Sequence, residues 1–189
     1  MKFLIALFAP IFFLPLLNVA FAQDDKPAPA AEAPAEKAPA AKAETVTAGE
    51  FTFDLGDKWT AGKPTSRMVS GVAKHTATKS MMKFYYFGEG QGGGIKANVD
   101  RWKGQFKKLD SEKVEAKKFG DHTAHVVYCT GTYNDGPMFG PKTPKADHAM
   151  LGAICESKKG AVFLKLTAPK ATVEKLRADF DALLASAYK

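Results

Sequence analysis

The sequence has 189 residues, of which 46% are hydrophobic and 25% charged, with 27 basic and 20 acidic side chains. This length allows one domain with a proper hydrophobic core and excludes an array of several domains. The chain has no H-E-x-x-H, C-x-x-C, G-x-S-x-G or Walker A motif. Motifs therefore give no support to four classes of protein: metalloproteases, thiol-redox proteins, serine hydrolases and P-loop proteins.

The N-terminus has the pattern of a secretory signal peptide. Lys2 precedes an apolar run over residues 3–17, and Ala20-Phe-Ala22 gives a cleavage site before Gln23. The run is shorter than the roughly 20 apolar residues that a membrane span needs. We expect residues 1–22 to be removed, which predicts an exported, periplasmic or secreted protein whose mature chain has no transmembrane segment. The alternative is a retained membrane anchor.

Residues 23–44 are almost entirely Ala, Pro, Lys, Glu and Asp, with no aromatic or branched aliphatic side chain. Such a composition cannot bury enough apolar surface to fold, so we expect a disordered linker. A single domain is therefore predicted over residues 45–189.

The predicted domain is basic. The first 44 residues hold four lysines and five acidic residues, which leaves 23 basic and 15 acidic residues and a net charge of +8 for residues 45–189. A cationic exported domain is attracted to acidic polymers and anionic envelope surfaces. The lysines are scattered, which equally fits an ordinary solvated surface, and export argues against a nucleic-acid partner.

Strands are predicted on both sides of a central helix. Before it, alternating or apolar runs indicate strands over 51–55, 68–78 and 81–87, with Trp59 as a core anchor. Ile95, Val99, Trp102, Phe106 and Leu109 then recur with helical spacing, which predicts a helix of fourteen or fifteen residues with Gly104 inside it and Trp102 in the core.

Four more strands are predicted over 113–118, 122–133, 146–156 and 161–167. A final helix opens at Pro169, with an apolar stripe of Val173, Leu176, Phe180 and Leu183 or Leu184. The predicted class is α+β: an antiparallel or mixed sheet of six or seven strands covered by two main helices.

Several segments resemble a group of uncharacterised exported bacterial proteins. They are Tyr85-Tyr-Phe-Gly-Glu-Gly-Gln-Gly-Gly-Gly94, Arg101-Trp-Lys-Gly-Gln-Phe106, Gly131-Thr-Tyr133, Ala153-Ile-Cys-Glu156 and Phe163-Leu-Lys-Leu-Thr-Ala-Pro169. The element order is similar to that of the PsbP-like fold, the fold of the photosystem II extrinsic proteins. The resemblance implies an α-β-α sandwich that works as a binding or assembly-assisting module, with no catalytic residues to carry over.

A glycine-rich segment joins the third predicted strand to the helix. It contains Gly88, Gly90, Gly92, Gly93 and Gly94 and satisfies G-x-G-x-x-G. Two features argue against a dinucleotide site: the helix is expected to begin only near Ile95, and the acidic residue that binds ribose is missing. Two interpretations stay open: an anion or partner contact through backbone N–H groups, and a turn whose glycines supply positive φ.

The connection over residues 134–147 is the stronger candidate for binding, because long connections without internal structure are often functional. Met138 and Phe139 give it an apolar tip, and Lys142 and Lys145 flank that tip. The alternative is that Phe139 folds back onto the core.

No metal or cofactor is predicted. His122 and His125 are three residues apart in one strand and therefore point to opposite faces. All four histidines, with His75 and His148, are expected on the surface.

The two cysteines, Cys129 and Cys155, fall in predicted strands of an exported domain, and export favours oxidation. We expect them to form a disulfide; two separately buried thiols are the alternative.

These patterns predict a monomeric, non-enzymatic module that binds a macromolecular or envelope partner, such as an envelope protein or an acidic polymer. Two alternatives remain: a small-ligand or anion-binding protein, an enzyme included, that uses residues 88–94, and a cationic structural protein of the envelope.

Overall fold

The structure is a computed structural model that describes residues 44–137 and 139–189. The predicted signal peptide, the linker up to residue 43 and Met138 lie outside the described residues. Within the described part, the elements in chain order are β1 (Thr45–Ala48), β2 (Phe51–Asp54), β3 (Trp59–Gly62), β4 (Gly71–His75), β5 (Met81–Tyr86), α1 (Ile95–Lys103), β6 (Phe106–Phe119), β7 (His122–Asp135), β8 (Thr143–Cys155), β9 (Val162–Pro169) and α2 (Lys170–Ser186).

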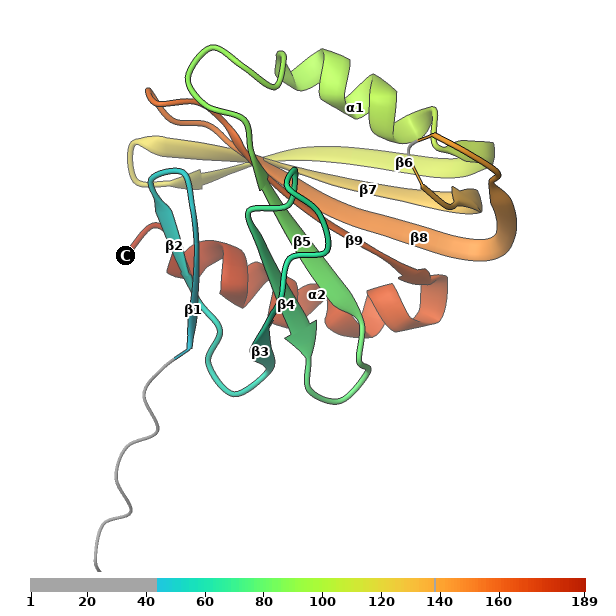
Figure 1. Cartoon of the computed structure of the whole chain (residues 1–189), viewed down its shortest axis with the longest axis horizontal. Helices are drawn as coiled ribbons and strands as arrows, with labels where there is room; N and C mark the ends of the chain where they lie inside the picture. Colours follow the sequence, from blue (N-terminus) through green and yellow to red (C-terminus); the bar gives the residue numbers. More distant parts are fainter. Residues whose placement is uncertain (1–43, 138) are drawn as a thin grey trace, which may run out of the picture. The chain divides into compact units, whose positions relative to one another are not determined.

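Seven strands form one antiparallel sheet in the order β3-β4-β5-β9-β8-β7-β6, and β1 and β2 form a separate hairpin (Figure 1). The predicted α+β class, with a seven-stranded sheet and two helices, is confirmed, and the sheet is antiparallel rather than mixed. Strand β1 was not predicted, although it begins at Thr45, the first residue of the predicted domain.

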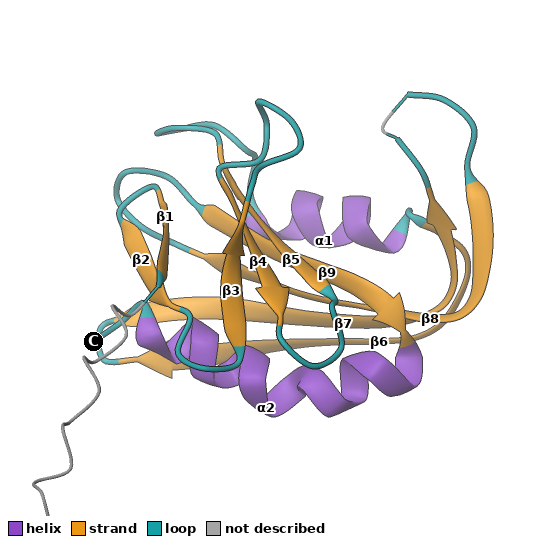
Figure 2. Cartoon of the chain, turned by 60° about the horizontal axis from the view of Figure 1, so that its bottom comes forward, coloured by secondary structure: helices purple, strands orange, loops and turns teal. Residues whose placement is uncertain are grey.

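Helix α2 covers one face of the sheet (Figure 2). The five residues of its predicted apolar stripe, with both Leu183 and Leu184, are all buried. They pack with inward side chains of the central strands, such as Phe84, Leu164 and Leu166. The β1–β2 hairpin extends this layer, since the rings of Phe53 and Phe84 lie 4.9 Å apart between centroids.

Helix α1 covers the opposite face and is much shorter than the sequence predicted. It ends at Lys103, and Gly104 caps it by donating its N–H to Asp100 O at 2.9 Å. The prediction that the helix continues to Leu109 is wrong, because Phe106 and Leu109 belong to β6. Register shifts within β6, between Phe106 and Lys108 and between Leu109 and Ser111, put both side chains on one face despite their helix-like spacing.

The predicted disulfide is contradicted, since Cys129 and Cys155 are both free and buried. Cys129 is opposite Met150 in the β7–β8 pair, whereas Cys155 is opposite Ala124, five residues away along β7. Cys129 packs in the α1-side cluster and Cys155 in the α2-side cluster. Two thiols on opposite faces, separated by about 16 Å of strand at 3.3 Å per residue, cannot bond.

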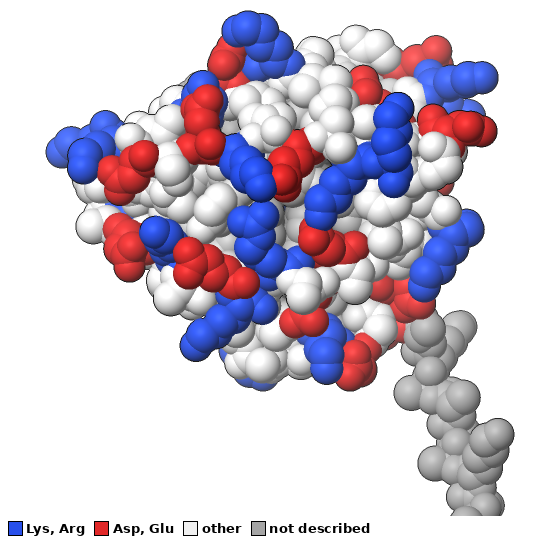
Figure 3. Space-filling model, turned by 180° about the vertical axis from the view of Figure 1, so that it is seen from behind, with Lys and Arg blue, Asp and Glu red and all other residues white. Residues whose placement is uncertain are grey.

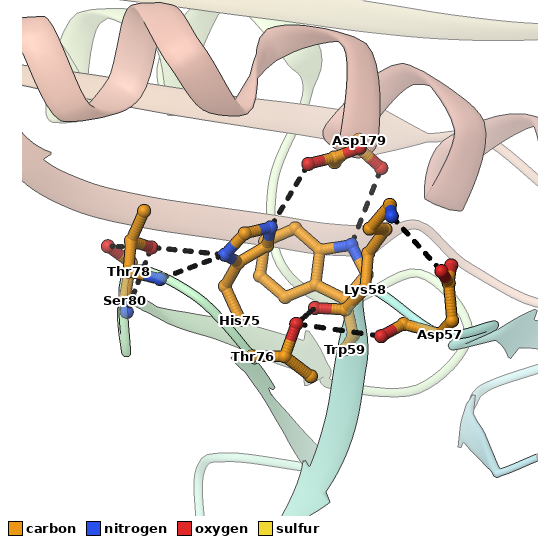
Figure 4. Close-up of polar contacts among 8 residues, drawn as sticks. All are labelled: Asp57, Lys58, Trp59, His75, Thr76, Thr78, Ser80 and Asp179. Carbon is orange, nitrogen blue, oxygen red and sulfur yellow. Dashed lines mark hydrogen bonds and ion pairs between the residues drawn. The ribbon is translucent and has the colours of Figure 1, made fainter.

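His75 is buried rather than exposed as predicted, with 5% of its surface accessible. Its Nε2 lies 3.0 Å from Asp179 Oδ2 of α2, and Nδ1 accepts the backbone N–H of Thr78 at 3.2 Å (Figure 4). The Trp59 ring packs edge-on against the imidazole at 4.9 Å and donates Nε1–H to Asp179 O at 3.4 Å. This group ties the β3–β4 edge of the sheet to α2.

Trp102 is the main contact between α1 and the sheet. It is 4% exposed, and a Cβ added to Gly152 of β8 would lie 2.7 Å from its ring. The indole therefore sits directly on the backbone of a central strand. The glycine at 152 is what allows this approach.

Trp102→Ala should lower the free energy of unfolding by about 3–5 kcal/mol, because it removes the largest side chain between α1 and the sheet. Chemical denaturation followed by circular dichroism measures this change. Phe139→Ala is the matched control, since Phe139 is 89% exposed and its truncation should leave stability within about 0.5 kcal/mol. Equal stabilities of the two variants would contradict the packing of α1 described here.

Candidate functional site

The glycine-rich segment is a turn with left-handed backbone conformations. Gly88, Gly90, Gly92 and Gly93 have positive φ, and α1 begins after them at Ile95 as predicted. A Cβ at position 92 would also lie 2.9 Å from the Phe163 ring, so the loop lies closely on the sheet. Glycine is needed here both for φ and for space.

Asn98 of α1 holds this turn in place. It is 1% exposed, and its Nδ2 lies 2.8, 3.1 and 2.9 Å from the carbonyl oxygens of Gly92, Gly93 and Gly94. Arg101 donates to the Oδ1 of the same side chain. Three loop carbonyls therefore converge on a donor inside the protein, which favours the structural interpretation of the glycines over an anion or partner site.

The connection between β7 and β8 is shorter than predicted and spans residues 136–142. Phe139 is 89% exposed, so it does not fold back onto the core. Lys142 donates to the carbonyl oxygen of Pro137 within the loop, and Lys145 pairs with Asp135 at 2.5 Å across its base. Of the four residues predicted at this site, Met138 lies outside the described residues, Lys142 and Lys145 are exposed, and Phe139 is an exposed apolar side chain.

Beside this loop, the face of the sheet that carries α1 has an open part, here called the basic hollow. It has a volume of about 240 Å³. It is lined from β5, β7, β8, β9 and the β4–β5 turn by Lys79, Met81, Lys83, Tyr133, Asp135, Lys145, His148 and Thr167. Three lysines thus face one aspartate, and that aspartate is already paired with Lys145.

Two lysines oppose each other beside the basic hollow: Lys83 lines it, and Lys165 lies next to the lining residue Tyr133. Lys83 of β5 and Lys165 of β9 are direct partners in the antiparallel register, so their side chains lie on the same face. Lys165 donates to Tyr133 Oη at 3.1 Å and to Gln105 Oε1, both neutral oxygens. In residues 44–137 and 139–189, neither lysine forms an ion pair with a carboxylate.

The environment of Lys165 disfavours its charged form. Burial, followed by the charges of Lys83, Arg101 and Lys142, lowers its pKa from 10.5 to about 8. The carboxylate of Asp135 opposes this shift. Burial also raises the pKa of Tyr133 to about 12, so that the hydroxyl beside Lys165 stays neutral.

Sequence reasoning missed the basic hollow because no motif marks it. The alternation of side chains along a strand indicates which residues of β5 share a face with Lys83 and which residues of β9 share a face with Lys165. That alternation does not give the register or the neighbour order that bring the two lysines together. The short α1, which leaves this part of the sheet open, was also not predicted.

The histidines show no shared ligand geometry. The ring of His122 lies 5.6 Å from that of Tyr188, whereas His125 pairs with Glu156 at 3.1 Å, so the two side chains have different surroundings. His148 lies against Ala146 O, with Nδ1 at 2.8 Å. Within the described residues, no three His, Cys, Asp or Glu side chains are grouped as metal ligands would be.

One group of side chains has the composition of a catalytic triad. Thr78 Oγ1 lies 3.2 Å from His75 Nδ1, and His75 Nε2 lies 3.0 Å from Asp179 (Figure 4). The backbone N–H of Thr78 also donates a hydrogen bond to His75 Nδ1. The Thr78 hydroxyl donates to Ser80 Oγ at 3.0 Å. A histidine that already accepts a backbone donor is a poor base for the hydroxyl, so the arrangement fits a structural tie.

One face of the molecule carries both signs of charge. On the face opposite to that viewed in Figure 1, Lys and Arg are interspersed with Asp and Glu (Figure 3). The positive net charge is therefore spread as an ordinary solvated surface over this face. No helix in the described part of the chain is long and apolar enough to cross a membrane.

Asn98→Asp should destabilise the protein by about 2–3 kcal/mol, because it removes the amide donor from three carbonyls and keeps the acceptor for Arg101. Thermal unfolding of both proteins is the measurement. Gln91→Glu, the same chemical change at an exposed position of the same loop, is the control and should have little effect. A Asn98→Asp variant as stable as the control would show that Asn98 does not hold the turn.

The stability of the protein should depend on Lys165 between pH 8 and 10.5. The folded pKa lies below the unfolded one, so the unfolded chain binds more protons in this window and stability rises with pH. The free-energy penalty of burying the charged ammonium group is present in full below about pH 8, and at about 1.4 kcal/mol per pH unit it amounts to at most about 3.5 kcal/mol.

Lys165→Met removes the pH-dependent penalty of the buried ammonium group. The stability of this variant relative to wild type should therefore fall steadily as pH rises through the same window. Denaturation at several pH values tests this, with the exposed residue Lys175→Met as the matched change of charge. A constant difference between Lys165→Met and wild type would contradict the burial of the ammonium group.

No family model matches the chain, and no curated protein matches it either. Among solved structures, the chain is similar to the solution structure of cyanobacterial PsbP (CyanoP) from Synechocystis sp. PCC 6803. The identity is 11%, the match covers 72% of this chain and 85% of that one, and the TM-score is 0.48. This match names the same fold family as the resemblance in element order, and at this TM-score it carries no argument about function.

Proposed function

We propose that the chain is an exported, non-enzymatic binding or assembly module whose macromolecular partner docks on the β7–β8 loop. The observation that carries this proposal is Phe139, a large apolar side chain that is 89% exposed in the middle of that loop. Export is supported by the pattern of residues 1–22.

An exposed aromatic ring on an anchored loop suits recognition. The base of the loop is fixed by the pairing of Asp135 with Thr143 and by the Lys145–Asp135 ion pair at 2.5 Å. Lys142 donates to the Pro137 carbonyl and orders the inner part of the loop. Aromatic side chains that project from fixed loops lose little entropy on binding and are frequent sources of binding energy.

The other two functions considered from the sequence have weaker support at the positions first assigned to them. The carbonyls of Gly92, Gly93 and Gly94 bind the Asn98 amide, which supports a structural role for the glycine segment. The mixed charges on the face shown in Figure 3 do not favour a purely cationic structural role. A small anion remains relevant at the basic hollow.

The proposal is tested by placing a photo-crosslinking amino acid at position 139 in the exporting host. Irradiation should give a discrete crosslinked species that contains one envelope partner. The same amino acid at position 175, on the exposed side of α2, is the control and should not give that species.

Crosslinking at position 175 to the same extent would indicate non-specific contact and would overturn the assignment of the loop. The absence of any adduct at position 139, with the protein folded and exported, would overturn it as well. Cell fractionation in the same experiment tests the predicted localisation.

A further inference from the structure

The basic hollow is a second candidate site, separate from Phe139 in its chemistry. Its volume of about 240 Å³ corresponds to about eight water molecules at roughly 30 Å³ each. That space is enough for a small charged group and part of the molecule that carries it. Its lining is more polar than apolar and includes three lysines and one aspartate.

The central fact is the opposition of Lys83 and Lys165. Like charges placed directly opposite each other in a sheet repel and destabilise the pair. Lys145 is compensated by Asp135 at 2.5 Å, whereas Lys79 Nζ donates to a neutral carbonyl, Thr76 O, at 2.5 Å. Lys165 has only the neutral oxygens of Tyr133 and Gln105, and Lys83 lines the hollow.

The backbone next to these groups is also unusual. Lys79 in the β4–β5 turn has a φ of 61° and Asp147, adjacent to His148, has a φ of 50°. Side chains other than glycine adopt this region infrequently and at a small energetic cost. One of these residues, Lys79, lines the hollow, and the other directly precedes the lining residue His148.

We propose that the basic hollow binds a phosphate group through Lys83, with the Thr167 hydroxyl as a further donor and with Lys165, the cross-strand neighbour of Lys83, as a second positive charge. A phosphate monoester carries a charge of about −1.5 to −2 and three acceptor oxygens. That charge matches Lys83 and Lys165, which have no carboxylate partner within the described residues. The residues that line the hollow include lysine and no arginine, and lysine binds phosphate well as a point charge, whereas planar carboxylates favour the arginine fork.

This site does not depend on the function proposed for Phe139 and adds to it. The phosphate could come from a free phosphate or phosphomonoester, or from the headgroup of an anionic lipid. Both sources offer a phosphate group to the same lysines, but the phosphodiester of a lipid such as phosphatidylglycerol carries one negative charge and two non-bridging oxygens instead of three. The two arms of the test therefore separate them.

The first arm titrates the full chain, purified from an exporting host, with inorganic phosphate at a fixed ionic strength of about 0.15 M, so that screening stays constant. Isothermal calorimetry reports the affinity. The second arm measures co-sedimentation with phosphatidylglycerol vesicles, using phosphatidylcholine vesicles as the reference. Wild type is compared with Lys83→Met, Lys165→Met and the control Lys175→Met.

Loss of about tenfold in affinity for each of the first two variants, with no loss for Lys175→Met, supports the site. If the loss occurs with inorganic phosphate, the ligand is a free phosphate; if it occurs only with phosphatidylglycerol, the ligand is a lipid headgroup. No binding in either arm overturns the proposal. So does an equal loss in Lys175→Met, which would show general attraction to a basic protein.

Folding of the variants is checked by thermal unfolding without ligand. Lys165→Met replaces a buried charge by an apolar side chain of similar length, so it should remain folded. If Lys83→Met is unfolded, Lys83→Gln keeps a polar side chain of similar length and takes its place in both arms.

A pH profile distinguishes a direct contact from a structural effect of Lys165. The groups that face Lys165 are Lys83 on β5, Arg101 on α1, Lys142 on the β7–β8 loop, and Asp135 and Tyr133 on β7. Between about pH 8 and pH 9.5 Lys165 loses its proton, so wild-type affinity should fall several-fold, and that of Lys165→Met should fall less. Parallel profiles would exclude Lys165 as a ligand of phosphate.

Discussion

The difference in length between the two helices determines which part of the sheet is covered. Helix α2 has 17 residues and spans about 26 Å, whereas α1 has nine residues and spans about 14 Å, at 1.5 Å per residue. The central strands β7 and β8 have 14 and 13 residues and extend to about 45 Å at about 3.3 Å per residue. The α1 side therefore cannot be closed by its helix, and the basic hollow is the part of that face left open.

Two side chains and a glycine fix where α1 begins and ends. Asn98 binds the carbonyls of the preceding turn, which sets the start of the helix at Ile95. Trp102 seats the last turn on Gly152 of β8, and Gly104 ends the helix two residues later. The chain then enters β6 at the sheet edge, where Phe106 packs its ring 5.4 Å from Tyr133. The same tyrosine lines the hollow, so the end of the helix also positions a wall of the site.

The sequence predicts the layers of this fold better than its details. Period-two and period-3.6 patterns locate most strands and the stripe of α2, because burial on one face imposes those periods. The pattern fails at Phe106 and Leu109, where irregular strand register imitates helical spacing. It fails also for the cysteines, since strand neighbours and faces, not separation along the chain, decide which thiols meet. The sequence left open whether Phe139 is exposed or folds back onto the core, because the exposure of a loop side chain produces no periodic pattern in the sequence.

The basic hollow illustrates why a site can escape such patterns. Its lining comes from four strands and a turn that span residues 79–167, so no short segment contains it. The feature that marks it is energetic: Lys83 and Lys165 oppose each other on one face of the sheet, and within the described residues neither pairs with a carboxylate. Folding alone gives no advantage to that arrangement, and local inconsistencies of this kind are most often found at functional sites. A bound anion would remove the repulsion, so the ligand would stabilise the same sheet that forms its site.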